Sequence, residues 1–406
     1  MTLPVVSAPV IFGAFAFAYF LSALLRAVTA TLAPVFSAEL GLRAADLGLL
    51  AGAYFFGFAV MQLPLGKALD RFGPRRTLLA LTGLAVVGCG AFALSPNLWA
   101  LIASRALVGA GMAAALMAPL TAYRQHFSPA AQLRANSWML MAGSLGMVAS
   151  TLPVQLLLPL LGWRGLFWAL AVVLLGAVGL VVACVPRDVR RPAAAHVAEV
   201  GYRTIVRHPL FLRCAPLGFF VYGGLIAVQS LWAGPWLTRV CGWTADQAAQ
   251  GLFGINLAML LAFATWGALM PRLVQRGVGA LRLMAWGVPL SLLLLALNVA
   301  LGAQAGAAHW AAWCVACSFV SLSQPAVAAV FPASQAGRAL SAYNLVIFGG
   351  VFCIQWGLGL LIDLLRAQGW SDDAAFRCAF AAFGLCGLAA YGWFLRSGAH
   401  AADNPA

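Results

Sequence analysis

Long apolar stretches alternate with short polar segments along almost the whole chain. A helix needs about 20 apolar residues to cross the roughly 30 Å of hydrocarbon in a bilayer, and it satisfies its backbone polar groups internally. Twelve stretches reach this length. We therefore predict an all-α membrane protein with twelve transmembrane helices, over residues 9–35, 46–67, 77–95, 98–123, 136–161, 165–185, 211–238, 245–270, 280–301, 308–330, 340–365 and 374–396.

Composition supports this interpretation. Of the 406 residues, 63% are hydrophobic and only 8% are charged. Even a large water-soluble domain leaves much of its surface wet, so it could not bury this much apolar surface. Lipid must therefore surround most of the chain.

Basic residues are unevenly distributed between the two sides of the predicted membrane. Outside the helix interiors, 17 Lys and Arg residues lie on one side and 5 on the other. Basic residues accumulate in cytoplasmic loops, which predicts cytoplasmic termini for an integral protein of a bacterial inner membrane. The net charge of +14 then reflects topology and contact with anionic lipid, and it does not indicate a nucleic-acid partner.

A short loop after the second predicted helix carries five charges. Residues 66–76 read Gly-Lys-Ala-Leu-Asp-Arg-Phe-Gly-Pro-Arg-Arg. This loop resembles the signature G-x-x-x-D-R-x-G-R-[KR]-[KR] of major facilitator superfamily transporters, with Pro74 in place of the first basic residue after the glycine. The resemblance implies that Asp70 meets the positive N-terminus of the eleventh helix and closes the cytoplasmic side. The predicted gating residues are Gly66, Asp70, Arg71, Gly73, Arg75, Arg76 and Arg338, the last as the partner of Asp70.

The chain also contains an internal repeat, because residues 267–272 align with residues 66–71 at an offset of 201. In the family that the loop resembles, two repeats of six helices are related by an axis along the membrane normal, with the substrate site between them. We therefore expect the major facilitator fold, with two pseudo-symmetric six-helix bundles over residues 1–185 and 211–406. Residues 186–210 would form a cytoplasmic central loop, either as a short amphipathic helix on the membrane surface or as a flexible linker.

Two arginines lie inside predicted helices, Arg26 in the first and Arg105 in the fourth. Such a charge costs about 2.5–3.5 kcal/mol unless it faces water or a partner. Tyr19, Ser22 and Arg26 recur at helical spacing and would share one wet face. Guanidinium groups bind carboxylates bidentately, so we predict that both arginines contact a small organic anion. The pair also resembles the organic-anion branch of the superfamily. The alternative for Arg105 is a structural or coupling role, because it begins an R-x-x-x-G stretch typical of the family's fourth helix.

Polar residues of the second half complete the predicted site. Tyr222 and Gln229 are seven residues apart, like Tyr19 and Arg26, and the pseudo-symmetry would place them opposite that pair. An amide side chain in an apolar helix needs hydrogen-bond partners, which either a water-filled cavity or a neighbouring helix can supply. Both a role in the substrate site and a role in helix packing therefore stay open for these residues. The predicted substrate-binding residues are Tyr19, Ser22, Arg26, Arg105, Tyr222, Gln229, Gln324 and Asn344.

Coupling to protons or another ion has two candidates near the outer side, Asp363 in the eleventh helix and His309 in the tenth. The organic-anion branch commonly adds acidic residues to the helices that carry its arginines. This chain has none there, which leaves proton coupling open.

The leading hypothesis is therefore a secondary active or facilitative transporter of a small organic solute, an anion such as a carboxylate, that works by alternating access. One alternative is a proton-coupled drug or metabolite efflux antiporter, and a second is a transporter-like solute sensor. The sequence shows no phosphate-binding loop, no catalytic cluster and no metal-ligand spacing. We therefore expect neither an enzyme nor a cofactor.

Overall fold

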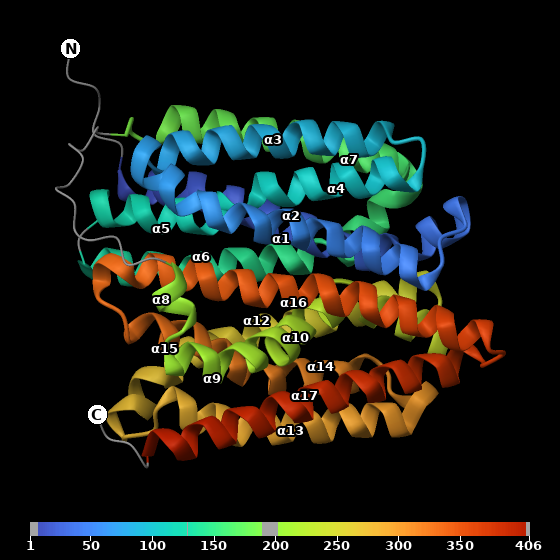
Figure 1. The fold of residues 1–406 in the computed structure, drawn as a ribbon. Helices are drawn as coiled ribbons and strands as arrows, with labels where there is room; N and C mark the ends of the chain where they lie inside the picture. The colour runs from blue at the N-terminus through green and yellow to red at the C-terminus, as the bar shows by residue number, and fades with distance from the viewer. Residues whose placement is uncertain (1–6, 128, 189–201, 403–406) are drawn as a thin grey trace.

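The computed structural model describes residues 7–127, 129–188 and 202–402 as a bundle of helices that run roughly side by side (Figure 1). Eleven of the described helices are long and apolar enough to cross a membrane, and Trp138–Ala149 adds a shorter apolar helix. The N-terminal half, in blue to green, and the C-terminal half, in yellow to red, meet along α2 and α16. The predicted all-α membrane fold is confirmed.

The N-terminal half contains the first six predicted spans. Its helices are α1 (Ala8–Leu40), α2 (Ala44–Phe72), α3 (Pro74–Leu94), α4 (Leu98–Met112), α5 (Ala114–His126), α6 (Pro129–Ala149) and α7 (Leu152–Cys184). The fourth span consists of α4 and α5, and the fifth consists of α6 and the start of α7. Gly162 ends the fifth span, because its φ of 61° and ψ of 171° break the helical path within α7. The rest of α7 is the sixth span. Because α7 continues through the boundary between the fifth and sixth spans, the twelve predicted spans appear as eleven long apolar helices and the shorter Trp138–Ala149.

The C-terminal half contains the other six spans and begins with α8 (Tyr202–Val206), which lies in the predicted central loop. The seventh span is α9 (Pro209–Leu217), α10 (Gly223–Ala227) and α11 (Ala233–Pro235), linked and followed by π-helical turns at Gly218–Tyr222, Val228–Trp232 and Trp236–Val240. The remaining helices are α12 (Ala245–Gln275), α13 (Ala280–Leu301), α14 (Ala307–Cys317), α15 (Ser323–Ala329), α16 (Ala333–Ala367) and α17 (Asp372–Ala402). The 3₁₀ turns Gly302–Gln304 and Ser318–Leu322 precede and follow α14.

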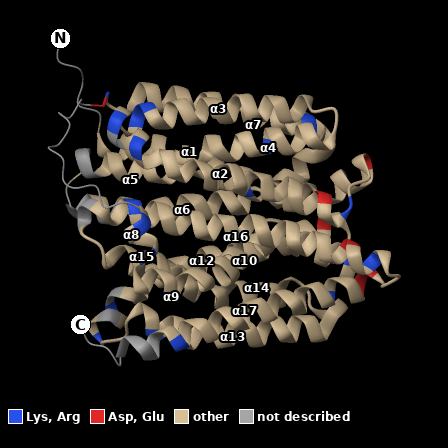
Figure 2. Cartoon of the chain, viewed as in Figure 1, with Lys and Arg blue, Asp and Glu red and all other residues tan. Residues whose placement is uncertain are grey.

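Charged side chains divide the molecule into two ends (Figure 2). Lys and Arg gather where both chain termini lie, and most Asp and Glu residues gather at the opposite end. We call these the basic end and the acidic end. The acidic end holds Glu39 in the last turn of α1, Asp363 near the end of α16, and Asp46, Asp246, Asp372 and Asp373 in the first turns of α2, α12 and α17.

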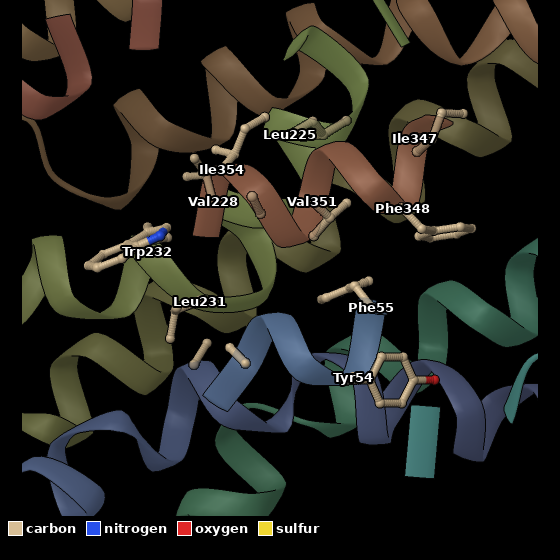
Figure 3. Packing of buried hydrophobic residues seen from close by; sticks show 14 of the residues in the cluster. Tyr54, Phe55, Leu225, Val228, Leu231, Trp232, Ile347, Phe348, Val351 and Ile354 are labelled. Atoms are coloured by element: carbon tan, nitrogen blue, oxygen red, sulfur yellow. The ribbon is translucent and has the colours of Figure 1, made fainter. Parts of the chain in front are cut away.

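The largest of three hydrophobic clusters extends across both halves, and the two smaller ones lie within the N-terminal half. Figure 3 shows Tyr54 and Phe55 of α2 near Phe348 and Val351 of α16. The ring centroids of Phe55 and Phe348 lie 6.1 Å apart. The interface beside the predicted site is therefore well packed, and it fixes α2 against α16.

Candidate functional site

Arg26 lies on α1 and is half-buried in the middle of the bundle. Its Nε atom is buried without a hydrogen-bond acceptor. Among the described residues, none forms a hydrogen bond or an ion pair with its guanidinium group. A charge in this position is costly until something of opposite charge or strong dipole approaches it. Arg26 is therefore a cation without a hydrogen-bond or ion-pair partner among the described residues, and its predicted contact with a ligand stays a prediction.

Three tyrosines from three spans lie around Arg26. Tyr54 of α2 and Tyr222 of the seventh span both lie within range of the Arg26 charge, and Tyr19 of α1 lies within the same range of both phenols. Tyr54 is held in place by α1, because its hydroxyl donates a 3.1 Å hydrogen bond to the Ser22 carbonyl and lies 3.3 Å from the Ser22 Oγ atom. We call Arg26, Tyr19, Tyr54 and Tyr222 the Arg26 site. It draws residues from both halves of the molecule.

Arg105 on α4 has a different environment, because its residue is only 1% exposed. Its Nη2 atom donates to the Leu25 carbonyl at 2.7 Å and to the Thr29 hydroxyl at 2.6 Å, and both acceptors belong to α1. Its guanidinium carbon lies 5.2 Å from the centre of the Tyr54 ring, which allows a cation–π contact. Arg105 thus ties α4 to α1 and supports Tyr54. Its Nε and Nη1 atoms are buried without a hydrogen-bond partner among the described residues, so the predicted contact of Arg105 with an anion stays a prediction beside this structural role.

The opposite roles of the two arginines predict opposite effects on stability. Arg105→Gln should lower the unfolding temperature of the purified, ligand-free protein by several degrees, because it removes two charge-assisted hydrogen bonds between α1 and α4. Arg26→Gln should leave that temperature unchanged or raise it, because it removes a partly buried charge that has no partner. Thermal unfolding followed by tryptophan fluorescence measures both. Equal destabilisation by the two variants would contradict these assignments.

No carboxylate accompanies either arginine in the membrane. All ten Asp and Glu residues of the sequence lie outside the predicted spans or close to their ends. Asp363 lies one turn before the end of α16. The middle of the bundle therefore carries two positive charges and no negative one. An anion offsets this charge, whereas a cation would be repelled.

The predicted amides bind one another. Gln229 Nε2 donates to Asn256 Oδ1 at 2.8 Å, and Gln324 Nε2 donates to Asn344 Oδ1 at 2.7 Å. Gln229 and Asn344 are both buried. Each of these four side chains thus has one partner on another helix, and the predicted substrate contacts of Gln229, Gln324 and Asn344 stay predictions.

The charged loop at residues 66–76, which we call the motif loop, lies at the basic end. It is held in place by Asp188, a residue that the sequence analysis did not identify. The Asp188 carboxylate accepts hydrogen bonds from the backbone N–H groups of Arg75, at 3.1 Å, and Arg76, at 2.9 Å, in the first turn of α3. Gly73 precedes that turn with a φ of 84°, and a Cβ there would overlap Asp188. Arg75 Nη2 also donates to the Val182 carbonyl at 2.8 Å. These contacts attach the loop to the end of α7.

Other predicted gating contacts stay predictions. The side chain of Asp70 lies outside the described residues, so its expected contact with Arg338 and the start of α16 is not tested. Arg71 lies over the Phe72 ring at 5.1 Å, and Gly66 lies in the last turns of α2. A Cβ on Gly66 would be 3.9 Å from the Tyr202 hydroxyl of α8, so this glycine is near the central loop.

The two candidates for ion coupling, Asp363 and His309, lie toward the acidic end, near the end of α16 and at the start of α14. Asp363 accepts hydrogen bonds from the backbone of α2, which gives it a structural partner. His309 lies in the first turn of α14, and its Nδ1 atom is buried without an acceptor. A coupling role for His309 stays a prediction. Among the described residues, no three His, Cys, Asp or Glu side chains come together as metal ligands would.

Comparison with known proteins decides the family. Residues 15–354 match the Major Facilitator Superfamily. The chain belongs to this superfamily. It is therefore an integral membrane protein and a transporter of small solutes, as its relatives are.

Curated relatives of the chain are bacterial transporters. A probable sulfoacetate transporter of Cupriavidus necator is 26% identical over 67% of this chain and 67% of that protein. A 4-hydroxybenzoate transporter of Pseudomonas aeruginosa is 30% identical over 36% of this chain, which spans only 33% of that relative. The inner membrane transport protein YajR of Escherichia coli is 33% identical over 36% of this chain and 32% of its own length.

Solved structures share the fold at low sequence identity. A bacterial homologue of the human lysosomal transporter Spinster, in an inward-facing and unoccupied conformation, has a TM-score of 0.77 and 17% identity over 98% of this chain and 99% of that one. A D-xylose–proton symporter has a TM-score of 0.71 and 16% identity over 93% of this chain and 96% of that one. These structures support the fold alone.

Proposed function

We propose that this superfamily member carries a small organic anion, such as a carboxylate, across a bacterial inner membrane by alternating access. The observation that carries the proposal is the Arg26 guanidinium, which has no acceptor among the described residues and lies on α1, a helix that contacts the second half. Two relatives support the same solute class, because sulfoacetate and 4-hydroxybenzoate, after which those transporters are named, are organic anions. An unpaired arginine also disfavours cationic drugs as cargo.

The proposed site gives each residue a distinct role. Arg26 binds the anionic group of the cargo through its fork of N–H donors. Tyr19 and Tyr222 provide hydroxyl groups and aromatic walls for the rest of the molecule, and Tyr54, whose hydroxyl is hydrogen-bonded to Ser22, supports them from the buried side. Arg105 holds α1 and Tyr54 in position through its hydrogen bonds to Leu25 and Thr29 and its contact with the Tyr54 ring. Because Tyr222 comes from the C-terminal half, cargo at this site contacts both halves and can affect how they move relative to each other.

The π-helical turns of the seventh span support a functional role for this region. Tyr222 ends one such turn and Gln229 lies in the next. Single π-helical turns are rare, and they often occur at functional sites.

Sidedness follows from the charge distribution. The basic end, which holds the motif loop and both chain termini, would face the cytoplasm, and the acidic end would face outward. This assignment agrees with the predicted topology.

The solute class can be tested by ligand-induced thermal stabilisation. The purified protein would be heated with panels of carboxylates, sulfonates, phosphorylated compounds, neutral amides and organic cations. A ligand at 100 times its Kd stabilises the folded state by about 2.7 kcal/mol, so one or more anions should raise the unfolding temperature by a few degrees. Stabilisation by organic cations alone would contradict the proposal and favour drug efflux.

A further inference from the structure

At the acidic end, a carboxylate from one half lies on the first turn of a helix from the other. Asp363 of α16 accepts hydrogen bonds from the backbone N–H groups of Ala44, at 3.2 Å, and Ala45, at 2.8 Å, where α2 begins. The first N–H groups of a helix have no partner within it, and they form the positive end of its dipole. Asp363 therefore satisfies two of them and places a negative charge where it is most favourable.

The two helices approach closely at this point because glycines line the contact. A Cβ on Gly48 of α2 would overlap the Gln355 carbonyl of α16, and one on Gly359 of α16 would overlap the Ala44 carbonyl of α2. Any larger residue would separate the backbones. The close approach is what allows the short side chain of Asp363 to reach the start of α2.

A small ion-pair network holds Asp363 in this orientation. The Asp363 side chain is 17% exposed, and its Oδ1 atom lies 3.8 Å from Arg366 Nη1. Arg366 Nε lies 2.7 Å from Asp372 Oδ1, and Arg239 Nη1 lies 3.8 Å from Asp372 Oδ2. The network links the end of α16 to the start of α17 and the end of the seventh span. All of its members belong to the C-terminal half, and only Asp363 crosses to the other half.

Other contacts across the halves lie toward the same end. Gly234 of α11 packs against the Ala30 carbonyl of α1, where a Cβ would come within 2.7 Å of the oxygen. Gln155 of α7 donates a 3.0 Å hydrogen bond to Asp246 of α12. Asp363 thus belongs to a closed seam that includes three pairs of spans.

We propose that Asp363 is an outer latch, which holds the acidic end closed and must release α2 before that end can open. The inference rests on the proposed alternating-access transport, but it does not depend on the class of solute. It replaces the ion-coupling role that the sequence suggested for Asp363.

The position of the latch complements the motif loop at the other end of the same helix pair. Asp70 lies near the C-terminal end of α2, beside the basic end where α16 begins. Asp363 lies near the C-terminal end of α16, beside the acidic end where α2 begins. Each helix therefore carries a carboxylate at the end where the other helix starts. If Asp70 meets the start of α16 as its motif predicts, the same chemistry would stabilise either closed side of the protein.

Hydrogen–deuterium exchange of the ligand-free protein in lipid nanodiscs tests the latch without a known cargo. Asp363→Ala should speed exchange several-fold in peptides that cover the start of α2. Because the seam would open as a unit, exchange should also rise in peptides around Ala30 and Gly234, which do not contact Asp363. Asp373→Ala is the matched control, because Asp373 pairs with Arg377 in its own helix at 3.3 Å and has no hydrogen bond or ion pair to the described residues of the other half.

A second variant approaches the same seam without changing charge. Gly359→Ala should reproduce the pattern of Asp363→Ala, since its methyl group would push α2 away from α16. If Asp363→Ala proves unstable, Asp363→Asn and Gly359→Ala answer the same question. Faster exchange confined to the first turn of α2 would show that Asp363 only caps that helix, and it would overturn the latch. That result would leave the proposed anion site intact, because Arg26 takes no part in the measurement.

Discussion

Replacing Arg26 by glutamine should lower the apparent affinity for the transported anion by about 100-fold or more. A bidentate pair between guanidinium and carboxylate contains two charge-assisted hydrogen bonds, each worth about 1.5–3 kcal/mol, and each 1.4 kcal/mol is tenfold in affinity. Glutamine keeps most of the size of the side chain but removes its charge. Uptake of the anion into proteoliposomes, together with the thermal shift that the same anion causes, measures the loss.

Two control variants make this result specific. Arg26→Lys keeps the charge without the planar fork, so it should retain part of the affinity and lie between the wild type and Arg26→Gln. Arg282→Gln removes one positive charge from an exposed position at the start of α13 and should transport normally. Transport by Arg26→Gln at the wild-type rate would remove Arg26 from the site and reopen the choice of solute class.

The asymmetry of the two repeats explains why only one half supplies charge. Tyr222 and Gln229 occupy the positions in the second repeat that Tyr19 and Arg26 occupy in the first. The tyrosines of both repeats lie near Arg26, as the pseudo-symmetry predicts. Gln229 instead pairs with Asn256 of α12. The second half thus contributes a neutral wall, and the charge of the site comes from the first half.

Much of the fold could be predicted because the information is local. The apolar stretches define the spans, and a boundary placed between residues 161 and 165 coincides with the break at Gly162. Arg26 was also identifiable, because an isolated charge in an apolar helix is visible from the neighbouring sequence. These features depend on residues within one helix, and hydrophobic periodicity reports them well.

The partners of buried polar groups could not be predicted, because they lie far away in the sequence. Arg105 is 80 residues from the Leu25 carbonyl that it binds, and Asp363 is 319 residues from Ala44. Tyr54 carried no signal beyond its place in an aromatic, apolar stretch of α2. Local sequence shows that such groups need partners, but the packing of helices decides which partners they meet.

The distribution of carboxylates also has a consequence for the transport cycle. When the empty carrier passes through a state closed at both ends, Arg26 loses access to water, and no Asp or Glu residue lies mid-membrane to neutralise it. A buried charge without a partner costs about 3–5 kcal/mol. If only about 1.4 kcal/mol of that cost is added to the activation barrier for reorientation, the empty carrier returns about tenfold more slowly. Bound anion removes this penalty, so loaded carriers should reorient faster than empty ones.

We therefore expect exchange of anions to be at least tenfold faster than net efflux. Proteoliposomes would be loaded with the anion that gives the largest thermal shift, and its efflux would be measured with and without the same anion outside. Potassium and valinomycin would hold the membrane potential near zero, so that charge accumulation does not limit net efflux. Equal rates of exchange and net efflux would contradict this expectation. Net transport driven strongly by a pH gradient would also contradict it, because such transport needs a group that takes up a proton, and the middle of the spans contains no Asp or Glu residue.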